Sequence, residues 1–334
     1  MMAELQSRIR KRYEMTKKNW KSDCKFSKKL ACLRLLDDIG GRVGFHKLSS
    51  WAHSQKEEWI LNYLQRMLDP VIQKYKKYDH NGISEENAPI WVCWWDGEEN
   101  APLLVRQCIK SIMKNSGEHP VNIVSEKNYS EYLDISEYIL NKMKTQKMGL
   151  AHFSDYLRVC LLERYGGLWL DATIFCSQMI PQECFSLPFF TCKSEVKKGR
   201  YLSEFQWVTF CLGGWKHQVF YQFMKEAFEL YWRMENVAID YLFFDDLIYI
   251  AKENIPSIRK LLEAVPINNI HRDDLQAAMN EVLPATEFWN VIKDDTALYK
   301  LSWRETYSES LSDGKQSIYG YFINRIEWEN TNDT

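Results

Sequence analysis

GGLWLDATIF, residues 166–175, is the stretch that most strongly predicts the fold of this chain. Two glycines are followed by three apolar residues and then by one acid, Asp171. A short apolar run bounded by glycine is typical of a buried strand. In open α/β sheets ligands bind beyond the carboxyl ends of the strands, so Asp171 is either a turn-capping residue or part of a ligand site.

The preceding residues predict a helix that leads directly into this strand. In HFSDYLRVCLLERYGG, residues 152–167, apolar residues recur at helical spacing and Ser154 is the predicted N-cap. Gly166 suits a left-handed C-terminal cap. We therefore expect Asp171 to lie at the end of a strand close to this helix.

An earlier segment predicts a βαβ unit. The run IWVCWW at 90–95 is typical of a buried strand, residues 104–112 have one apolar helical face, and PVNIVS at 120–125 is a second strand. A strand, helix and strand in so short a segment imply a parallel sheet. We expect an α/β fold with a mostly parallel sheet.

Other elements are expected on both sides of this unit. Residues 1–80 read as helical, with a helix that ends before Asp69-Pro70, and a polar linker follows at 81–89. The chain then divides into a helical region, 1–88, and an α/β domain, 89–334. Further predictions are a helix over 130–144, a strand with a Gly-Gly turn over 205–215, a core helix over 217–234 and a helix over 240–250.

Composition indicates an ordinary globular protein. The 334 residues are 46% hydrophobic and 26% charged. The nine cysteines are scattered without a CxxC pair, which favours reduced thiols and a cytoplasmic protein. We expect no secretion signal and no bilayer span, because no apolar run is long enough.

Charge is concentrated at the N-terminus. Residues 1–35 hold eleven basic and three acidic side chains, a net charge of +8, in a chain whose total is −2. Such a basic arm is either a solvated helix surface or a contact for a phosphate-bearing partner or an anionic membrane, at the inner face if the protein is cytoplasmic. Nucleic acid is disfavoured, because the rest of the chain is acidic and carries no recognisable binding motif.

The candidate residues suit transfer of a sugar from a nucleotide diphosphate donor, whose leaving group needs a metal or cationic side chains. Asp155 and Arg158 share one helix face, either as a local ion pair or as ligands of the donor. Trp94 and Trp95 point to opposite faces, so one could stack on a base. Asp240, and less clearly Asp245 and Asp246, opens a helix, where an acid is also favoured by the helix dipole.

Four stretches carry a resemblance to a known family. They are HFSDYLRVCLLERYGGLWLDATIF, IWVCWWDGEENAPLLVRQCIKSI, DYLFFDDLIYIAKENIP and TALYKLSWR, which together span roughly residues 89–304. The chain resembles the capsular polysaccharide synthesis family of bacterial glycosyltransferases, which is related to DXD sugar-binding transferases with a GT-A fold. The resemblance implies a GT-A-like domain with a single Rossmann-type nucleotide-sugar site.

The resemblance also implies a role for each matching residue. Trp94 would stack on the base, and Asp155 and Arg158 would bind the donor sugar and its phosphate. Asp171 would lead the DXD motif, facing ribose and a divalent metal, Mn or Mg. Asp240 would lie near the reacting carbon. The segment with Lys300, Ser302 and Trp303 would close over the diphosphate, with Lys300 as a cation for the leaving group.

One position departs from the family pattern. The motif reads Asp171-Ala172-Thr173, and a threonine is a weak metal ligand in place of the usual last acid. Either Asp171 holds the metal with the diphosphate and another residue, or cationic side chains replace it.

The expected function is transfer of a sugar, a hexose by preference, from a nucleotide-sugar such as a UDP-sugar. The expected acceptor is a growing, lipid-linked bacterial surface polysaccharide, and retention of configuration follows from the related DXD enzymes. The alternative is a non-catalytic carbohydrate- or nucleotide-binding protein derived from a transferase. A nucleotidyltransferase or dehydrogenase is disfavoured, because no GxGxxG or P-loop string follows the first strand.

Overall fold

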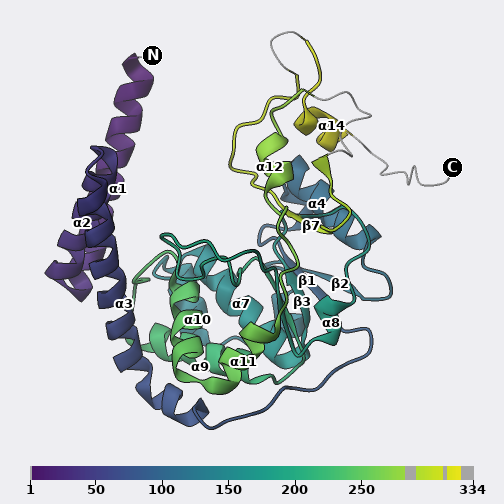
Figure 1. The fold of residues 1–334 in the computed structure, drawn as a ribbon, viewed down its shortest axis with the longest axis horizontal. Helices are drawn as coiled ribbons and strands as arrows, with labels where there is room; N and C mark the ends of the chain where they lie inside the picture. The colour runs from purple at the N-terminus through teal and green to yellow at the C-terminus, as the bar shows by residue number, and fades with distance from the viewer. Residues whose placement is uncertain (1, 283–290, 311–313, 325–334) are drawn as a thin grey trace.

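A five-stranded mixed sheet forms the centre of the protein (Figure 1). The computed structural model describes residues 2–282, 291–310 and 314–324. The strand order is β2-β1-β3-β6-β5, in which β1 pairs in parallel with β2 and β3 whereas β6 pairs antiparallel with β3 and β5. The strands are β1 (Ile90–Cys93), β2 (Val121–Val124), β3 (Gly167–Leu170), β5 (Phe189–Thr191) and β6 (Cys211–Gly214).

The predicted βαβ unit is confirmed, with helix α4 (Leu103–Lys114) between β1 and β2. The expectation of a mostly parallel sheet is correct for β2, β1 and β3 and wrong for the other edge. No helix lies between β5 and β6. Without a helical crossover the chain returns antiparallel to its neighbour, so the sheet is mixed.

Alternate side chains along the strands enter two hydrophobic cores, one on each face of the sheet. Trp91 and Trp169 belong to the core beneath helices α7 (Leu150–Tyr165), α9 (Val219–Met234) and α10 (Phe243–Asn254). Val92 and Leu170 belong to the core beneath α4. This period of two is the signature of strands that are buried on both faces. The predicted core role of α9 is confirmed by its fully buried Phe220, Phe223, Met224, Phe228 and Tyr231.

Two predicted helices have different bounds. α7 begins at Leu150 with Gly149 at the N-cap, so Ser154 is not the cap but lies in the second turn. The helix expected over 130–144 is two helices, α5 (Tyr129–Tyr132) and α6 (Glu137–Lys144).

The predicted Gly-Gly turn is wrong, because Gly213 and Gly214 are strand residues of β6. A Cβ on Gly213 would lie 2.7 Å from the carbonyl oxygen of Cys184, and one on Gly214 would lie 2.7 Å from that of Pro188. Glycine is therefore needed for close backbone approach rather than for a turn.

The N-terminal region is helical, as predicted, and shares a core with the α/β part. Helices α1 (Met2–Phe26) and α2 (Lys28–Arg42) stand beside the body, and α3 (His46–Tyr75) runs along α10 and α9 (Figure 1). Ile60, Leu64 and Leu68 of α3 are fully buried in that core. α3 continues through Pro70, past its predicted end, because buried residues after the proline still pack against the body.

A second, two-stranded sheet brings the C-terminal part to the central sheet. β4 (Ile174–Cys176), which follows β3, pairs antiparallel with β7 (Leu298–Lys300). The remaining elements are η1 (Glu98–Asn100), α8 (Glu183–Ser186), α11 (Pro256–Ala264), α12 (Asp274–Ala278) and α14 (Ile318–Asn324). Over the described ranges, no helix combines the length and the apolar character needed to cross a membrane.

Candidate active site

A cavity of about 430 Å³ opens where the parallel strands β1 and β3 end. Its walls come from the residue after β1, from α7, from the turn after β3, from the start of α10 and from residues 300–304. This volume lies within the range of about 300–1,000 Å³ that is usual for small-molecule sites. The cavity is also at the sheet edge where ligands of α/β proteins bind.

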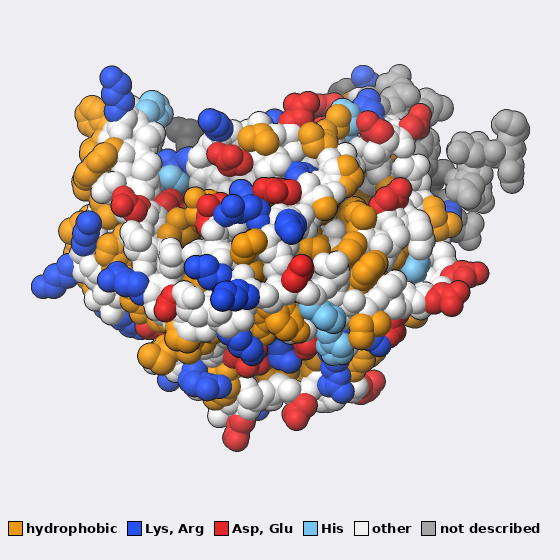
Figure 2. Space-filling model, turned by 60° about the horizontal axis from the view of Figure 1, so that its bottom comes forward, with side chains coloured by type: hydrophobic (Ala, Val, Ile, Leu, Met, Phe, Trp, Pro, Cys, Tyr) orange, Lys and Arg blue, Asp and Glu red, His pale blue; other side chains and the backbone are white. Residues whose placement is uncertain are grey.

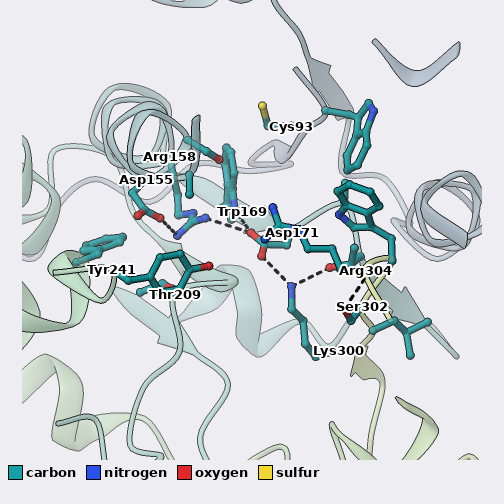
Figure 3. Close-up of a pocket in the computed structure, with 18 of the residues that line it drawn as sticks. Cys93, Asp155, Arg158, Trp169, Asp171, Thr209, Tyr241, Lys300, Ser302 and Arg304 are labelled. Carbon is teal, nitrogen blue, oxygen red and sulfur yellow. Dashed lines mark hydrogen bonds and ion pairs between the residues drawn. The ribbon is translucent and has the colours of Figure 1, made fainter. Parts of the chain in front are cut away.

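Asp171 lies in this cavity between two cations (Figure 3). Its Oδ1 accepts hydrogen bonds from Arg158 Nη2 at 3.1 Å and from the indole nitrogen of Trp169 at 3.0 Å. Its Oδ2 accepts from Lys300 Nζ at 2.8 Å. Both carboxylate oxygens are thus held by N–H donors, two of them charged, which fixes the orientation of the side chain.

The two-stranded sheet explains how Lys300 reaches Asp171 from 129 residues away. In the β4–β7 register Lys300 is opposite Ile174, and the backbone N–H of Leu301 donates to the carbonyl of Thr173 at 3.0 Å. Lys300 Nζ also donates to the Thr173 hydroxyl at 2.7 Å. The lysine therefore lies over the Asp171-Ala172-Thr173 motif.

Helix α7 supplies the other cation. Arg158 Nη1 donates to Asp155 Oδ1 at 2.9 Å, one helical turn away, so the predicted shared helix face is confirmed and the local ion pair is present. Binding of the donor by these two residues stays a prediction. The same guanidinium reaches Asp171 and lies 4.8 Å from the centre of the Trp169 ring. The Arg158 side chain is only 5% exposed, and one buried cation consequently joins two carboxylates.

The two acids differ in their expected charge. Burial raises the pKa of Asp171, but Lys300 and Arg158 outweigh it, so the pKa lies below its usual value. Burial raises the pKa of Asp155 to about 6, and Arg158 only partly opposes this shift. Asp171 is therefore the permanently charged member of the pair, and Asp155 titrates near neutrality.

Two tryptophans lie at the cavity wall opposite α7. The rings of Trp94 and Trp303 form an edge-to-face pair with centroids 5.7 Å apart. Within the described part of the chain, the buried indole nitrogen of Trp94 has no hydrogen-bond partner. Ser302 is held beside them, because its backbone N–H donates to Gln276 Oε1 at 2.6 Å. The structure thus brings together every predicted site residue except Asp240.

Asp240 lies outside this cavity. Its Oδ2 pairs with Arg34 Nη1 at 3.2 Å and with Lys56 Nζ at 3.5 Å, and the residue lines a second cavity beside the first. It precedes α10 rather than opening it, and its Oδ1 accepts from the backbone N–H of Leu242. Its predicted place at the reacting carbon remains a prediction.

Of the three acids in residues 240–246, Asp245 lines the first cavity. Its Oδ1 accepts a hydrogen bond from the Trp207 indole at 2.9 Å, and burial raises its pKa to about 7. Sequence reasoning noted Asp245 without choosing it over Asp240, because helix spacing cannot say which acid of a first turn faces a distant strand. It also missed Trp169 and Thr209. Strand alternation could have found Trp169, which is two residues before Asp171 and shares its side of the strand.

The described residues do not fit a divalent metal held by protein side chains. No three histidine, cysteine, aspartate or glutamate side chains gather in a metal-binding group within residues 2–282, 291–310 and 314–324. Lys300 Nζ, a positive charge, occupies the space beside Asp171 Oδ2 and the Thr173 hydroxyl. A metal held by Asp171 would take its other ligands from a diphosphate and water, and Lys300 Nζ would then have to leave Asp171 Oδ2.

Comparison with known proteins found one matching family and a distant relative. Residues 42–322 match the family described as "Capsular polysaccharide synthesis protein". A stretch of 133 residues is 29% identical to the O-glycosyltransferase braB of Annulohypoxylon truncatum, covering 37% of this chain and 31% of that protein. No solved structure matches. Since the family match extends over most of the sequence, the chain belongs to the capsular polysaccharide synthesis family.

Proposed function

We propose that this protein transfers a sugar, a hexose by preference, from a nucleoside diphosphate sugar to a glycan. The observation that carries the proposal is the charge arrangement of the cavity. Asp171 is fixed between Arg158 and Lys300, and Trp94 and Trp303 offer aromatic surface at the opposite wall. Two cations that suit a diphosphate, a carboxylate that suits ribose or sugar hydroxyls and aromatic rings that suit a base line one cavity, and this supports the proposal.

In the proposed reaction the bond between the anomeric carbon and the diphosphate oxygen breaks, and the acceptor oxygen bonds to that carbon from the same face, which retains the configuration. The acceptor hydroxyl passes its proton to the departing diphosphate. The diphosphate leaves with added negative charge, and Lys300 and Arg158 are the cations placed to stabilise it. Both are preorganised by Asp171, so little reorganisation accompanies bond cleavage. The relative named as an O-glycosyltransferase supports an oxygen acceptor.

The test is UDP release from a panel of UDP-sugars by the wild type and by Asp171→Ala, each with EDTA and with added manganese. We expect release that is unaffected by EDTA and that falls by about 100-fold or more in the variant, the scale of removing one preorganised electrostatic group. Release that requires manganese would contradict leaving-group stabilisation by side chains alone.

The alternative is a carbohydrate- or nucleotide-binding protein without activity. That alternative predicts binding of a UDP-sugar with no UDP released, with or without an acceptor. The two cations held by Asp171 favour an enzyme, because they suit a leaving group that gains negative charge as the bond breaks.

Family membership suggests the acceptor and the stereochemistry. The proposed acceptor is a growing bacterial surface polysaccharide carried on a lipid, and the related DXD enzymes favour retention at the anomeric carbon. Retention is tested by NMR, by comparing the coupling constant of the anomeric proton of the transferred sugar in the product with that in the donor.

We also propose a peripheral contact with an anionic membrane, as such an acceptor requires. The edge formed by the N-terminal helices exposes both hydrophobic and basic side chains (Figure 2). The turn between α2 and α3, here called the α2–α3 tip, exposes Ile39, Val43, Phe45, Leu48 and Trp51 by 40–66%. The exposed basic residues Arg12, Arg42 and Lys47 are near it in α1, α2 and α3. Exposed aromatic and basic side chains together are typical of a surface that lies in the headgroup region.

A further inference from the structure

A second cavity, of about 360 Å³, adjoins the first. It lies between helix α3, the loop at 197–205 and the start of α10. Leu242 and Asp245 line both cavities. A molecule in the second cavity would therefore lie next to whatever occupies the first, across this shared wall.

The floor of the second cavity is acidic. Asp246 is only 2% exposed, and its Oδ2 has no hydrogen-bond partner among the described residues. Burial raises the pKa of Asp246 well above its usual value.

The other acids have defined states. Asp240 is neutralised by Lys56 and Arg34, and Lys56 also pairs with Glu57 at 2.8 Å. Asp245 uses Oδ1 for the Trp207 indole. Asp245 and Asp246 are thus the floor groups available to a ligand.

The loop wall of this cavity carries both aromatic and basic side chains. Tyr201, which is 56% exposed, and Phe205 line it together with Lys197, Lys198 and Arg200. Acids and bases together therefore line this cavity, and such a mixed lining suits a neutral ligand whose hydroxyls donate to carboxylates and accept from cations. Aromatic faces cover the apolar side of a sugar ring.

We propose that the second cavity binds the neutral terminal sugar of the acceptor glycan, with one of its hydroxyls held by Asp245 at the shared wall. The proposal rests on the proposed function and adds the place and chemical class of the acceptor. Asp246 and Tyr201 would hold the far side of the same sugar.

The test uses the full chain with saturating UDP and octyl glycosides of glucose, galactose, rhamnose and N-acetylglucosamine. Saturation-transfer NMR reports glycoside binding, and calorimetry reports UDP binding separately. Leu202→Trp fills the second cavity. Val196→Trp adds the same bulk to the same loop at a residue that is 57% exposed and does not line the cavity, so it is the matched control.

We expect at least one glycoside to bind the wild type and Val196→Trp, and binding to weaken by about tenfold or more in Leu202→Trp, equivalent to about 1.4 kcal/mol. UDP affinity should be the same in all three proteins. A glycoside signal that survives in Leu202→Trp, or the absence of a signal with every glycoside in the wild type, would overturn the proposal. Failure of UDP to bind the wild type would instead count against the proposed function.

Discussion

At the scale of single residues, the contact between Asp171 and Lys300 carries most of the chemistry proposed here. Replacing Lys300 by Met removes the positive charge next to the expected leaving group and leaves Asp171 with Arg158 and Trp169. We expect the rate constant of UDP release to fall by about 10²–10³-fold, with a smaller loss in Lys300→Arg. Lys110→Met, an exposed change on α4, is the control. An unchanged rate in Lys300→Met would remove this lysine from the mechanism.

The raised pKa of Asp245 makes the free energy of unfolding depend on pH. Its pKa is about 7 in the folded protein, mainly through burial, against about 3.9 in an unfolded chain. The folded state then holds more protons at Asp245 between these values, so the contribution of Asp245 to stability is full below about pH 4 and is lost as pH rises from about 4 to 7. The nearby Asp155 strengthens this shift, and Arg158 and the Trp207 indole weaken it.

Asp245→Asn cannot ionise and keeps an oxygen for Trp207. Its melting temperature should fall less between pH 5 and pH 7.5 than that of the wild type, measured by calorimetry. The exposed Asp79→Asn variant should follow the wild type. Parallel curves for all three proteins would show that Asp245 does not titrate in this range.

At the scale of elements, the junction of α7 and β3 depends on Gly167. Its φ is +91°, and a Cβ there would lie 1.9 Å from the carbonyl oxygen of Pro89, on the residue before β1. Gly167→Ala should lower the free energy of unfolding by about 3 kcal/mol or more, through strain and overpacking together. Gly149, at the other end of α7, has φ −70° and open space around it, so Gly149→Ala should cost about 1 kcal/mol or less. Urea unfolding of both variants checks this difference, and equal losses would contradict it.

The elements that the sequence predicted correctly have strong local periodicity. Strand β1, helix α4 and strand β2 follow from apolar runs and a helical face, and α9 follows from its aromatic stripe. The misplaced bounds lie where local signals compete. Pro70 normally ends a helix, yet α3 continues because its next turn is buried. The Gly213-Gly214 pair reads as a turn, yet close packing of neighbouring backbone explains it.

At the scale of the whole molecule, the α2–α3 tip predicts membrane binding. Phe45→Asp with Trp51→Asp places two charges where apolar side chains would enter the headgroup region. We expect this double variant to lose most co-sedimentation with phosphatidylglycerol vesicles, while UDP release in solution is unchanged. Binding of the wild type should also weaken at high salt, because the basic residues around the tip act through screened charge.

Tyr78→Asp with Ile83→Asp is the control, because both residues are exposed but lie outside the N-terminal helices. Equal binding of the two double variants would contradict the proposal. Loss of wild-type self-association in the tip variant, with vesicle binding unaltered, would identify the tip as a contact between copies of the chain.

Local patterns in the sequence predicted the strand that ends before Asp171, the helix before it and the βαβ unit. These features depend on residues close together in the chain, whose apolar period directly reflects burial. The motifs shared with the family also pointed to seven residues that line the first cavity, but not to Trp169 or Thr209. Only the tertiary structure placed Lys300 against Asp171, chose Asp245 over Asp240 for that cavity and showed a second cavity beside it. These outcomes depend on a β4–β7 register and a packing of α3 against α10 that join segments far apart in sequence, and local patterns do not encode such pairings.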